Sequence, residues 1–234
     1  MTLPRKVRPE YTTTLSDGKK VKFMPFSVKE EKILVLAAET QDVDEVTNAI
    51  SNTLTNCVTS PANFDVEALP LFDIQLLFLK CRAKSAGEKI KVKITDPADE
   101  TYTVEHEINI DKIQLQTTKD HTNLVKLDDS TVVKMNYPDL KFFAEGLSLD
   151  GIVDTSKNIR ECISQIVVGE EVYNRADMTD EELDNWVEEL TTEDIAKFME
   201  FFNTMPTLKH KITLKNPNTK ENFSITLEGL QDFF

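Results

Sequence analysis

The 234-residue chain is 40% hydrophobic and 29% charged, which predicts a folded core and argues against wholesale disorder. Its formal net charge of −14 argues against nucleic acid as a partner, because the phosphates of nucleic acid are held by Lys and Arg. No apolar run approaches the ~20 residues of a membrane-spanning helix, so we expect no stable membrane insertion.

The first predicted element is a hairpin in YTTTLSDGKKVKFMPF, residues 11–26. Its two strands flank Asp17-Gly18, a turn dipeptide that tolerates positive φ. Ser27 then begins a helix, because Glu30 stands three residues later and completes a capping box. The apolar side of this helix is expected to comprise Val28, Ile33, Leu36 and Ala37.

Two further helices follow in the first part of the chain. Asp42 and Glu45 repeat the capping box and start a helix with apolar residues at helical spacing to Cys57. The segment LFDIQLLFLKCRAKSAGE, residues 71–88, is apolar almost throughout and then turns basic. It predicts a helix at the centre of the fold that runs to about Ser85 and is closed by Gly87.

The basic end of this central helix contains Lys80, Arg82 and Lys84, which we expect to emerge near the C-terminal end, where cations complement the helix dipole. Two interpretations of Arg82 remain open. Its guanidinium pairs with a carboxylate, because an unpaired buried charge is costly, or its side chain projects into solvent. The candidate carboxylates are those of Glu30, Glu31 and Asp73.

Two later segments share one plan. KIKVKITDPADETYTVEHEI and LKHKITLKNPNTKENFSITLEGL each contain a strand, an Asx-Pro turn and a second strand. We therefore predict an α+β fold in which helix clusters alternate with antiparallel hairpins. The chain is expected to form two halves of similar plan, residues 1–118 and 119–234, which can pack as one unit.

The middle of the chain predicts one more hairpin and four helices. NLVKL-DDS-TVVKM is the hairpin, and a short helix starts at Pro138. Thr179 and Glu182 form a capping box at the start of the third helix, and Pro206 ends the last one. The second of the four helices is expected to carry Ile159, Cys162, Ile163, Ile166 and Val167 on its apolar side.

No motif for a catalytic site, cofactor or metal is recognised, and none of the three is predicted. His106 and His210 fall on the apolar faces of hairpin strands, where they are either half-buried residues or a shared metal or pH-sensitive pair.

The three cysteines are expected to be reduced and buried, as in a cytoplasmic protein. They are Cys57, Cys81 and Cys162. The opening MTLPRKVRPEY has no apolar core, so no secretion signal is expected.

The excess of acid is concentrated between Val168 and Phe201, which contain twelve acidic and two basic residues. Helical spacing places Leu183 and Val187 on one side of a helix and the acids on the other, which is typical of a solvated face. Two alternatives stay open: paired catalytic carboxylates, and a surface for a basic partner segment. The candidate partner-binding residues are Glu181, Glu182, Trp186, Glu188 and Glu189.

Two segments, MPFSVKEEKILVLAAE and FDIQLLFLKCRAKSAGE, resemble the hallmark segments of the base plate protein family of T-even type bacteriophages. DDSTVVKMNYPDLKFF and the terminal LEGLQDFF also fit that family. The motif positions are Phe26, Glu30, Glu31, Lys32, Phe72, Asp73, Arg82, Lys84, Ser85, Gly87 and Glu88.

The resemblance implies a non-enzymatic, chaperone-like assembly protein that promotes formation of the baseplate central hub. It would act in the cytoplasm of the infected host, with other hub or tail proteins as partners. The alternatives are a permanent hub subunit in the virion and an enzyme that uses the carboxylates of residues 179–194. The first place to look for a partner contact is the helix exit, with Arg82, Lys84, Ser85 and Glu88.

The hairpin turns bear on metal dependence. Family hairpins of this kind can look like zinc ribbons with paired cysteines at the turns. Here the turns are DPADE and NPNTKE, without cysteine, so the resemblance carries over no zinc site.

Overall fold

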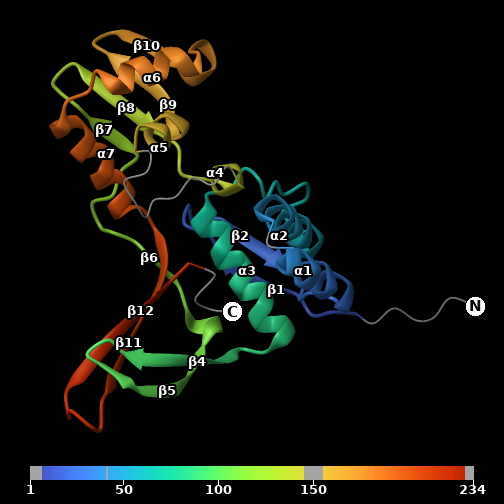
Figure 1. Ribbon diagram of the computed structural model, residues 1–234. Coiled ribbons are helices and arrows are strands. Elements are labelled where there is room, and N and C mark those ends of the chain that lie inside the picture. Colours follow the sequence, from blue (N-terminus) through green and yellow to red (C-terminus); the bar gives the residue numbers. More distant parts are fainter. Residues whose placement is uncertain (1–6, 41, 145–154, 230–234) are drawn as a thin grey trace, which may run out of the picture. The chain divides into compact units, whose positions relative to one another are not determined.

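The computed structural model describes residues 7–40, 42–144 and 155–229. These residues contain 7 helices and 12 strands in antiparallel sheets, which confirms the predicted α+β class (Figure 1). Two compact units are present: unit 1 is Met1–Gln116 with Thr207–Phe234, and unit 2 is Thr117–Pro206. The closing hairpin thus groups with the N-terminal unit, and the division into halves 1–118 and 119–234 stays a prediction about how the chain is organised.

Unit 1 begins with a small sheet and two capped helices. Strands β1 (Tyr11–Thr14) and β2 (Lys20–Phe23) form the predicted hairpin, and β3 (Val58–Ser60) pairs with β2. Helix α1 (Val28–Thr40) starts with the Ser27 backbone N–H donating to a Glu30 carboxylate oxygen at 2.7 Å. Helix α2 (Val43–Cys57) starts with the Glu45 N–H donating to Asp42 at 3.0 Å. Both predicted helix starts are confirmed.

Helix α3 (Leu71–Ala86) is the centre of unit 1, as the sequence predicts. Ten of its 16 residues are buried, and they lie all around the helix. It packs against α2, the short 3₁₀ helix η1 (Ile110–Lys112) and strand β11 (Thr207–Lys215). Gly87 closes it at φ 118, a conformation that favours glycine.

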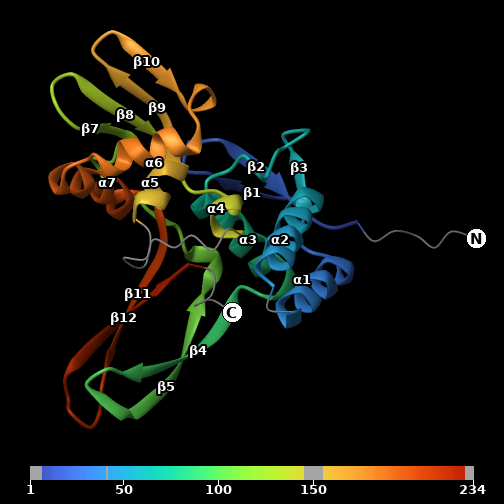
Figure 2. The ribbon, with the colours of Figure 1, turned by 45° about the horizontal axis from the view of Figure 1, so that its top comes forward.

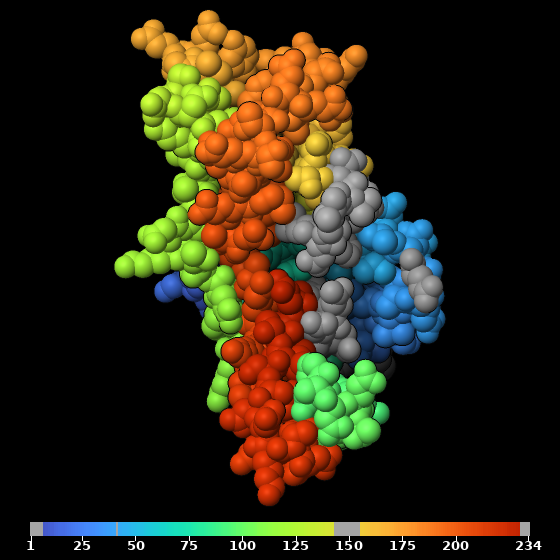
Figure 3. Space-filling view, turned by 60° about the vertical axis from the view of Figure 1, so that its left-hand side comes forward, coloured from blue at the N-terminus to red at the C-terminus, as the bar shows by residue number. Residues whose placement is uncertain are grey.

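The two similar hairpins lie side by side in unit 1. Strands β4 (Lys89–Asp96) and β5 (Asp99–Asn109) form the first, and β11 with β12 (Asn222–Glu228) forms the second (Figure 3). The short strand β6 (Leu115–Gln116) pairs with β11.

Their turns are joined by side-chain hydrogen bonds. The Asn216 amide donates to Asp96 at 2.7 Å and to Asp99 at 3.1 Å, and the Asn218 amide donates to Asp99 at 3.1 Å. The two Asx-Pro turns found in the sequence therefore meet in the structure.

Unit 2 consists of a four-stranded antiparallel sheet and helices that pack against the apolar side chains of the sheet. The strand order is β10 (Glu171–Asn174), β9 (Ile163–Val168), β8 (Thr131–Met135), β7 (Leu124–Lys126). The helices are α4 (Leu140–Ala144), α5 (Thr155–Cys162), α6 (Asp180–Glu188) and α7 (Thr192–Thr204), with the 3₁₀ helix η3 (Arg175–Asp177) before α6.

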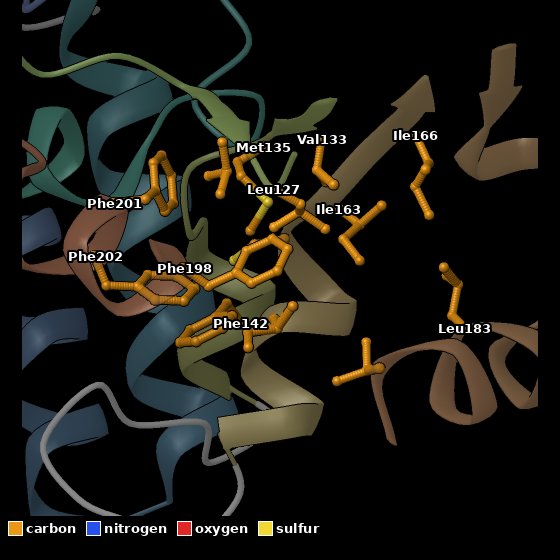
Figure 4. Packing of buried hydrophobic residues seen from close by; sticks show 14 residues of the cluster. Leu127, Val133, Met135, Phe142, Ile163, Ile166, Leu183, Phe198, Phe201 and Phe202 are labelled. Carbon is orange, nitrogen blue, oxygen red and sulfur yellow. The ribbon is translucent and has the colours of Figure 1, made fainter. Parts of the chain in front are cut away.

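The core of unit 2 forms where side chains of the sheet and of the helices converge (Figure 4). Val133 and Ile163 come from the sheet, Leu183 comes from α6, and Phe198 comes from α7; all four are almost fully buried. The helix starts of α6 and α7 carry complete capping boxes.

The predicted helix through Ile159 and Val167 is wrong in its second part. Helix α5 ends at Cys162, and the chain continues as strand β9, which pairs with β8 on one side and β10 on the other. Apolar residues three apart are typical of a helix. In strand β9 both Ile163 and Ile166 are buried because the pairing with β8 shifts register between Lys134 and Met135, which interrupts the alternation of sides. The β-branched sequence ISQIVV and two hydrogen-bonded neighbours favour the strand, and Gly169 at φ 60 turns it into β10.

Candidate interaction surfaces

The first candidate surface is the C-terminal end of α3. The Lys84 ammonium there lies 2.8 Å from an Asp111 carboxylate oxygen and 2.6 Å from one of Glu88. These hydrogen bonds, that to Asp111 first, raise the pKa of Lys84 and keep it charged. The same ammonium lies 5.2 Å from the centre of the Tyr11 ring. Two predicted partner-binding residues, Lys84 and Glu88, are thus already engaged within the chain.

Ser85 joins the two segments that carry the family resemblance. Its hydroxyl accepts a hydrogen bond from the Phe26 backbone N–H at 2.6 Å and donates to the Cys81 carbonyl at 2.6 Å. The Phe26 ring also lies 5.5 Å from the ring of Phe78 on α3, centre to centre. The start of α1 is therefore fixed to α3 by both a polar and an apolar contact.

Lys80 does not emerge at the surface, contrary to the sequence prediction. It is only 6% exposed, and its ammonium donates to the backbone carbonyls of Asp111 and, at 2.8 Å, of Ile113. Burial lowers its pKa. These carbonyls lie about 30 residues further along the chain, so no local pattern around Lys80 predicts them; the long Lys side chain reaches them because η1 packs against α3.

Arg82 is half-buried, and burial lowers its pKa. Two of the carboxylates predicted as candidates for it have other roles. Asp73 accepts hydrogen bonds from the backbone N–H and the hydroxyl of Ser16, at 2.8 and 2.7 Å. Glu30 caps α1 and lies 3.8 Å from Arg8. Both carboxylates therefore make their hydrogen bonds with other residues of unit 1.

The second candidate surface is the outer face of α6. Leu183 and Val187 are buried, and Trp186 packs at the edge of the unit 2 core, as the helical spacing predicts. Glu182 is exposed but has a structural role, because its carboxylate accepts from the backbone N–H and the hydroxyl of Thr179, each at 2.8 Å. These two hydrogen bonds, the backbone one first, lower its pKa.

The other three predicted acids at α6 differ from Glu182. Glu181, Glu188 and Glu189 are exposed and, within the part of the chain that the structure describes, make no ion pair. Their neighbour Asp184 differs, since it lies 2.6 Å from Arg160. The acidic face therefore contains some carboxylates that are bonded within the chain and others that are exposed and make no described ion pair.

The carboxylates of residues 179–194 were considered above as possible catalytic groups. Several of them are bonded to other side chains of unit 2. Asp180 pairs with Arg175, and Asp194 caps α7 by accepting the Thr191 hydroxyl at 2.7 Å. The hydrogen bond from Thr191 is the main cause that lowers the pKa of Asp194. These acids stabilise helix starts and the turn before α6.

A third surface was missed by the sequence analysis. The residues expected on the core side of α1 are mostly exposed: Val28 by 67%, Leu36 by 62% and Ile33 by 38%. Only Glu30 and Ala37 are buried on this helix. Because ILVLAA, residues 33–38, is apolar all around the helix, its periodicity does not show which side faces the core.

The histidines and cysteines lie on several different elements of the two units. His106 and His210 are half-buried on β5 and β11, and among the described residues no three His, Cys, Asp or Glu are grouped to hold a metal. His121 lies in unit 2, with its ring nitrogens 2.9 Å from the hydroxyls of Thr204 and Tyr137. All three cysteines, Cys57, Cys81 and Cys162, are free and buried, as predicted.

Comparison with known proteins gives one match. The family described as T4 bacteriophage base plate protein matches residues 8–234, nearly the whole chain. No curated protein and no solved structure shows a significant match. Across the described ranges, no helix has the length and apolarity that crossing a membrane requires. The last residues of the LEGLQDFF segment, 230–234, lie outside the described residues.

Proposed function

The chain belongs to the T4 bacteriophage base plate protein family, and from this premise we propose that it is a non-enzymatic assembly protein. Its role is to promote formation of the central hub of the baseplate through binding, without making or breaking covalent bonds. It acts in the cytoplasm of the infected host, on other hub or tail proteins. The observation that carries this proposal is the family match over residues 8–234.

The contacts of the family motif residues support a binding role. Phe26 and Ser85 are hydrogen-bonded to each other, and Lys84 is held by Asp111 and Glu88. Motif residues that hold a frame together preserve the shape of a surface, whereas catalytic residues are expected to converge on an accessible site. The motif therefore favours a protein that works through its shape.

The exposed acids of α6 indicate what one partner contact requires. Glu181, Glu188 and Glu189 present negative charge beside the half-buried Trp186. A basic segment with an apolar side chain matches such a face, because charges at the rim speed the encounter and apolar anchors hold the complex. We propose this face as the main contact, for a basic segment of a hub protein. The exit of α3 is proposed only as a secondary contact, because its Lys84 and Glu88 are paired within the chain.

A test of the acidic face uses the triple variant Glu181→Gln, Glu188→Gln and Glu189→Gln. Glu182 is left unchanged because it caps α6. A tagged copy of this variant should recover much less hub protein from infected cells than the natural chain. The control neutralises three exposed acids of unit 1, Glu10, Glu100 and Glu221, and should recover the natural amount. Equal recovery by both variants would exclude the α6 face.

The alternative role is a permanent structural subunit of the hub. Mass spectrometry of purified virions separates the two, because an assembly factor leaves the finished particle and a subunit stays in fixed copy number. We expect the chain to be absent from purified virions and present on assembly intermediates. A constant number of copies in each virion would establish the subunit role instead.

A further inference from the structure

Helix α1 exposes an unusual amount of apolar surface. Half of the large hydrophobic residues that are exposed in the described part of the chain lie between Val28 and Val43. Monomeric proteins rarely leave apolar side chains gathered in this way without a partner for them. The helix is also on the outside of unit 1, where it packs against α2 (Figure 2).

The exposed residues form a defined line along α1. Glu30 and Ala37 face the rest of unit 1, and a helical repeat of 3.6 residues places another set on the opposite side. We call this set the α1 stripe. Its members are Val28, Lys32, Val35, Leu36 and Glu39, all of them exposed.

The two charges of the α1 stripe are not used within the chain. Lys32 and Glu39 make no ion pair among the residues that the structure describes. They lie seven residues apart, which is too far for a contact along one helix. The surrounding region is also close to neutral, because residues 1–60 contain eight acidic and eight basic residues. Two copies of this region would therefore not repel each other, although the whole chain is acidic.

The order of residues in the stripe is complementary to itself when reversed. If two stripes run antiparallel about a two-fold axis between positions 35 and 36, Lys32 of each copy faces Glu39 of the other. Val35 then faces Leu36, so that the apolar pair lies between the two pairs of opposite charge. Such self-complementarity is what a two-fold interface between identical chains requires.

We propose that two copies of this chain associate through their α1 stripes in this antiparallel arrangement. A partner with a face of a single charge sign would leave either Lys32 or Glu39 unmatched, whereas a second copy satisfies both. One short helix from each copy makes a contact smaller than about 1,200 Å², the range of weak and transient association. The dimer is therefore favoured where the protein is concentrated. This inference is independent of the proposed function.

The experiment is sedimentation equilibrium from low to high micromolar concentrations, with charge-reversed variants. Lys32→Glu alone places Glu opposite Glu39 twice in the dimer, and Glu39→Lys alone places two lysine pairs together. Each should raise the dissociation constant about tenfold or more, because like charges across an interface are strongly unfavourable. The double variant Lys32→Glu with Glu39→Lys restores opposite charges and should dimerise as the natural chain does.

The control is Lys211→Glu, which makes the same change of charge at an exposed position on β11 of unit 1. It should leave dimerisation unchanged, and circular dichroism should show that all four variants are folded. A natural chain that stays monomeric throughout would overturn the proposal. So would single reversals without effect, or a double variant that fails to recover, since the antiparallel pairing requires both results.

Discussion

The end of α3 in unit 1 and the outer face of α6 in unit 2 look alike in sequence, since both combine an apolar helix with a group of charges. The structure separates them. At the end of α3, Lys80 and Lys84 are held by backbone carbonyls and carboxylates of η1 and its surroundings. On α6, Glu181 and Glu188 remain exposed. A group of charges in a sequence therefore does not reveal whether its partners lie inside or outside the chain.

The difference follows from how much of each helix is enclosed. Helix α3 is surrounded by other elements of unit 1, so that even its polar side chains meet protein groups. Helix α6 packs with one side only, and its other side is left to solvent. Changes at α3 should consequently cost stability, whereas changes on α6 should mainly affect binding.

The largest effect is expected for Lys80→Met. This variant keeps most of the apolar stem of the side chain but removes the ammonium, which leaves the carbonyls of Asp111 and Ile113 without their buried donor. We expect the free energy of unfolding, measured in urea, to fall by about 2–3 kcal/mol. Lys112→Met, at an exposed position of η1, is the matched control and should have little effect. If both variants were equally stable, the contrast between the two helices would fail.

A smaller effect is expected for Lys84→Gln, about 1 kcal/mol at neutral pH, because the pair with Asp111 is partly buried. The pKa of Lys84 is raised above the ordinary value of 10.5. Its contribution is therefore fully present below pH 10.5 and is lost as the pH rises through the raised value. The difference in stability between the natural chain and Lys84→Gln should shrink in alkaline urea titrations. A difference that is constant up to high pH would contradict this role.

For Thr179→Ala, which removes the cap of α6, the expected loss is about 1 kcal/mol. The hydrogen bonds from Thr179 lower the pKa of Glu182 below the ordinary value of 4.5. Their stabilising effect is present above pH 4.5 and is lost as the pH falls through the lowered value. In the variant only the hydrogen bond from the Thr179 hydroxyl to Glu182 is lost, because the backbone N–H remains. Thermal melts of the two proteins should therefore move closer together in acid without meeting, since the bond from the Glu182 N–H to the Thr179 hydroxyl does not depend on pH. Melts that stay equally far apart at low pH would show that the hydroxyl bond to the Glu182 carboxylate does not contribute.

The smallest effect on stability is expected for the triple variant of Glu181, Glu188 and Glu189. These side chains have no described ion pair to lose, so its melting temperature should match that of the natural chain. A marked destabilisation would mean that the acids of α6 are structural after all, like Lys84 on α3.

The sequence predicts best those elements whose start and apolar spacing agree. Thr179 with Glu182 and the hairpin around Asp17-Gly18 are examples, since each signal is local. Strand β9 was missed because Ile163 and Ile166 have the spacing of a helix, and only the register shift in the pairing with β8 lets a strand bury both. The burial of Lys80 depends on carbonyls of η1, far along the chain. For α1, an apolar run on all sides conceals which residues face the core.

The central claim, that the chain acts through its surfaces in hub assembly, is tested most directly by complementation. Cells are infected with a phage that lacks this gene, and completed baseplates are counted by electron microscopy. We predict that the natural chain and the triple variant of Glu10, Glu100 and Glu221 restore baseplates, while the triple variant of Glu181, Glu188 and Glu189 restores far fewer. Normal numbers of complete baseplates without any copy of the chain would contradict the account.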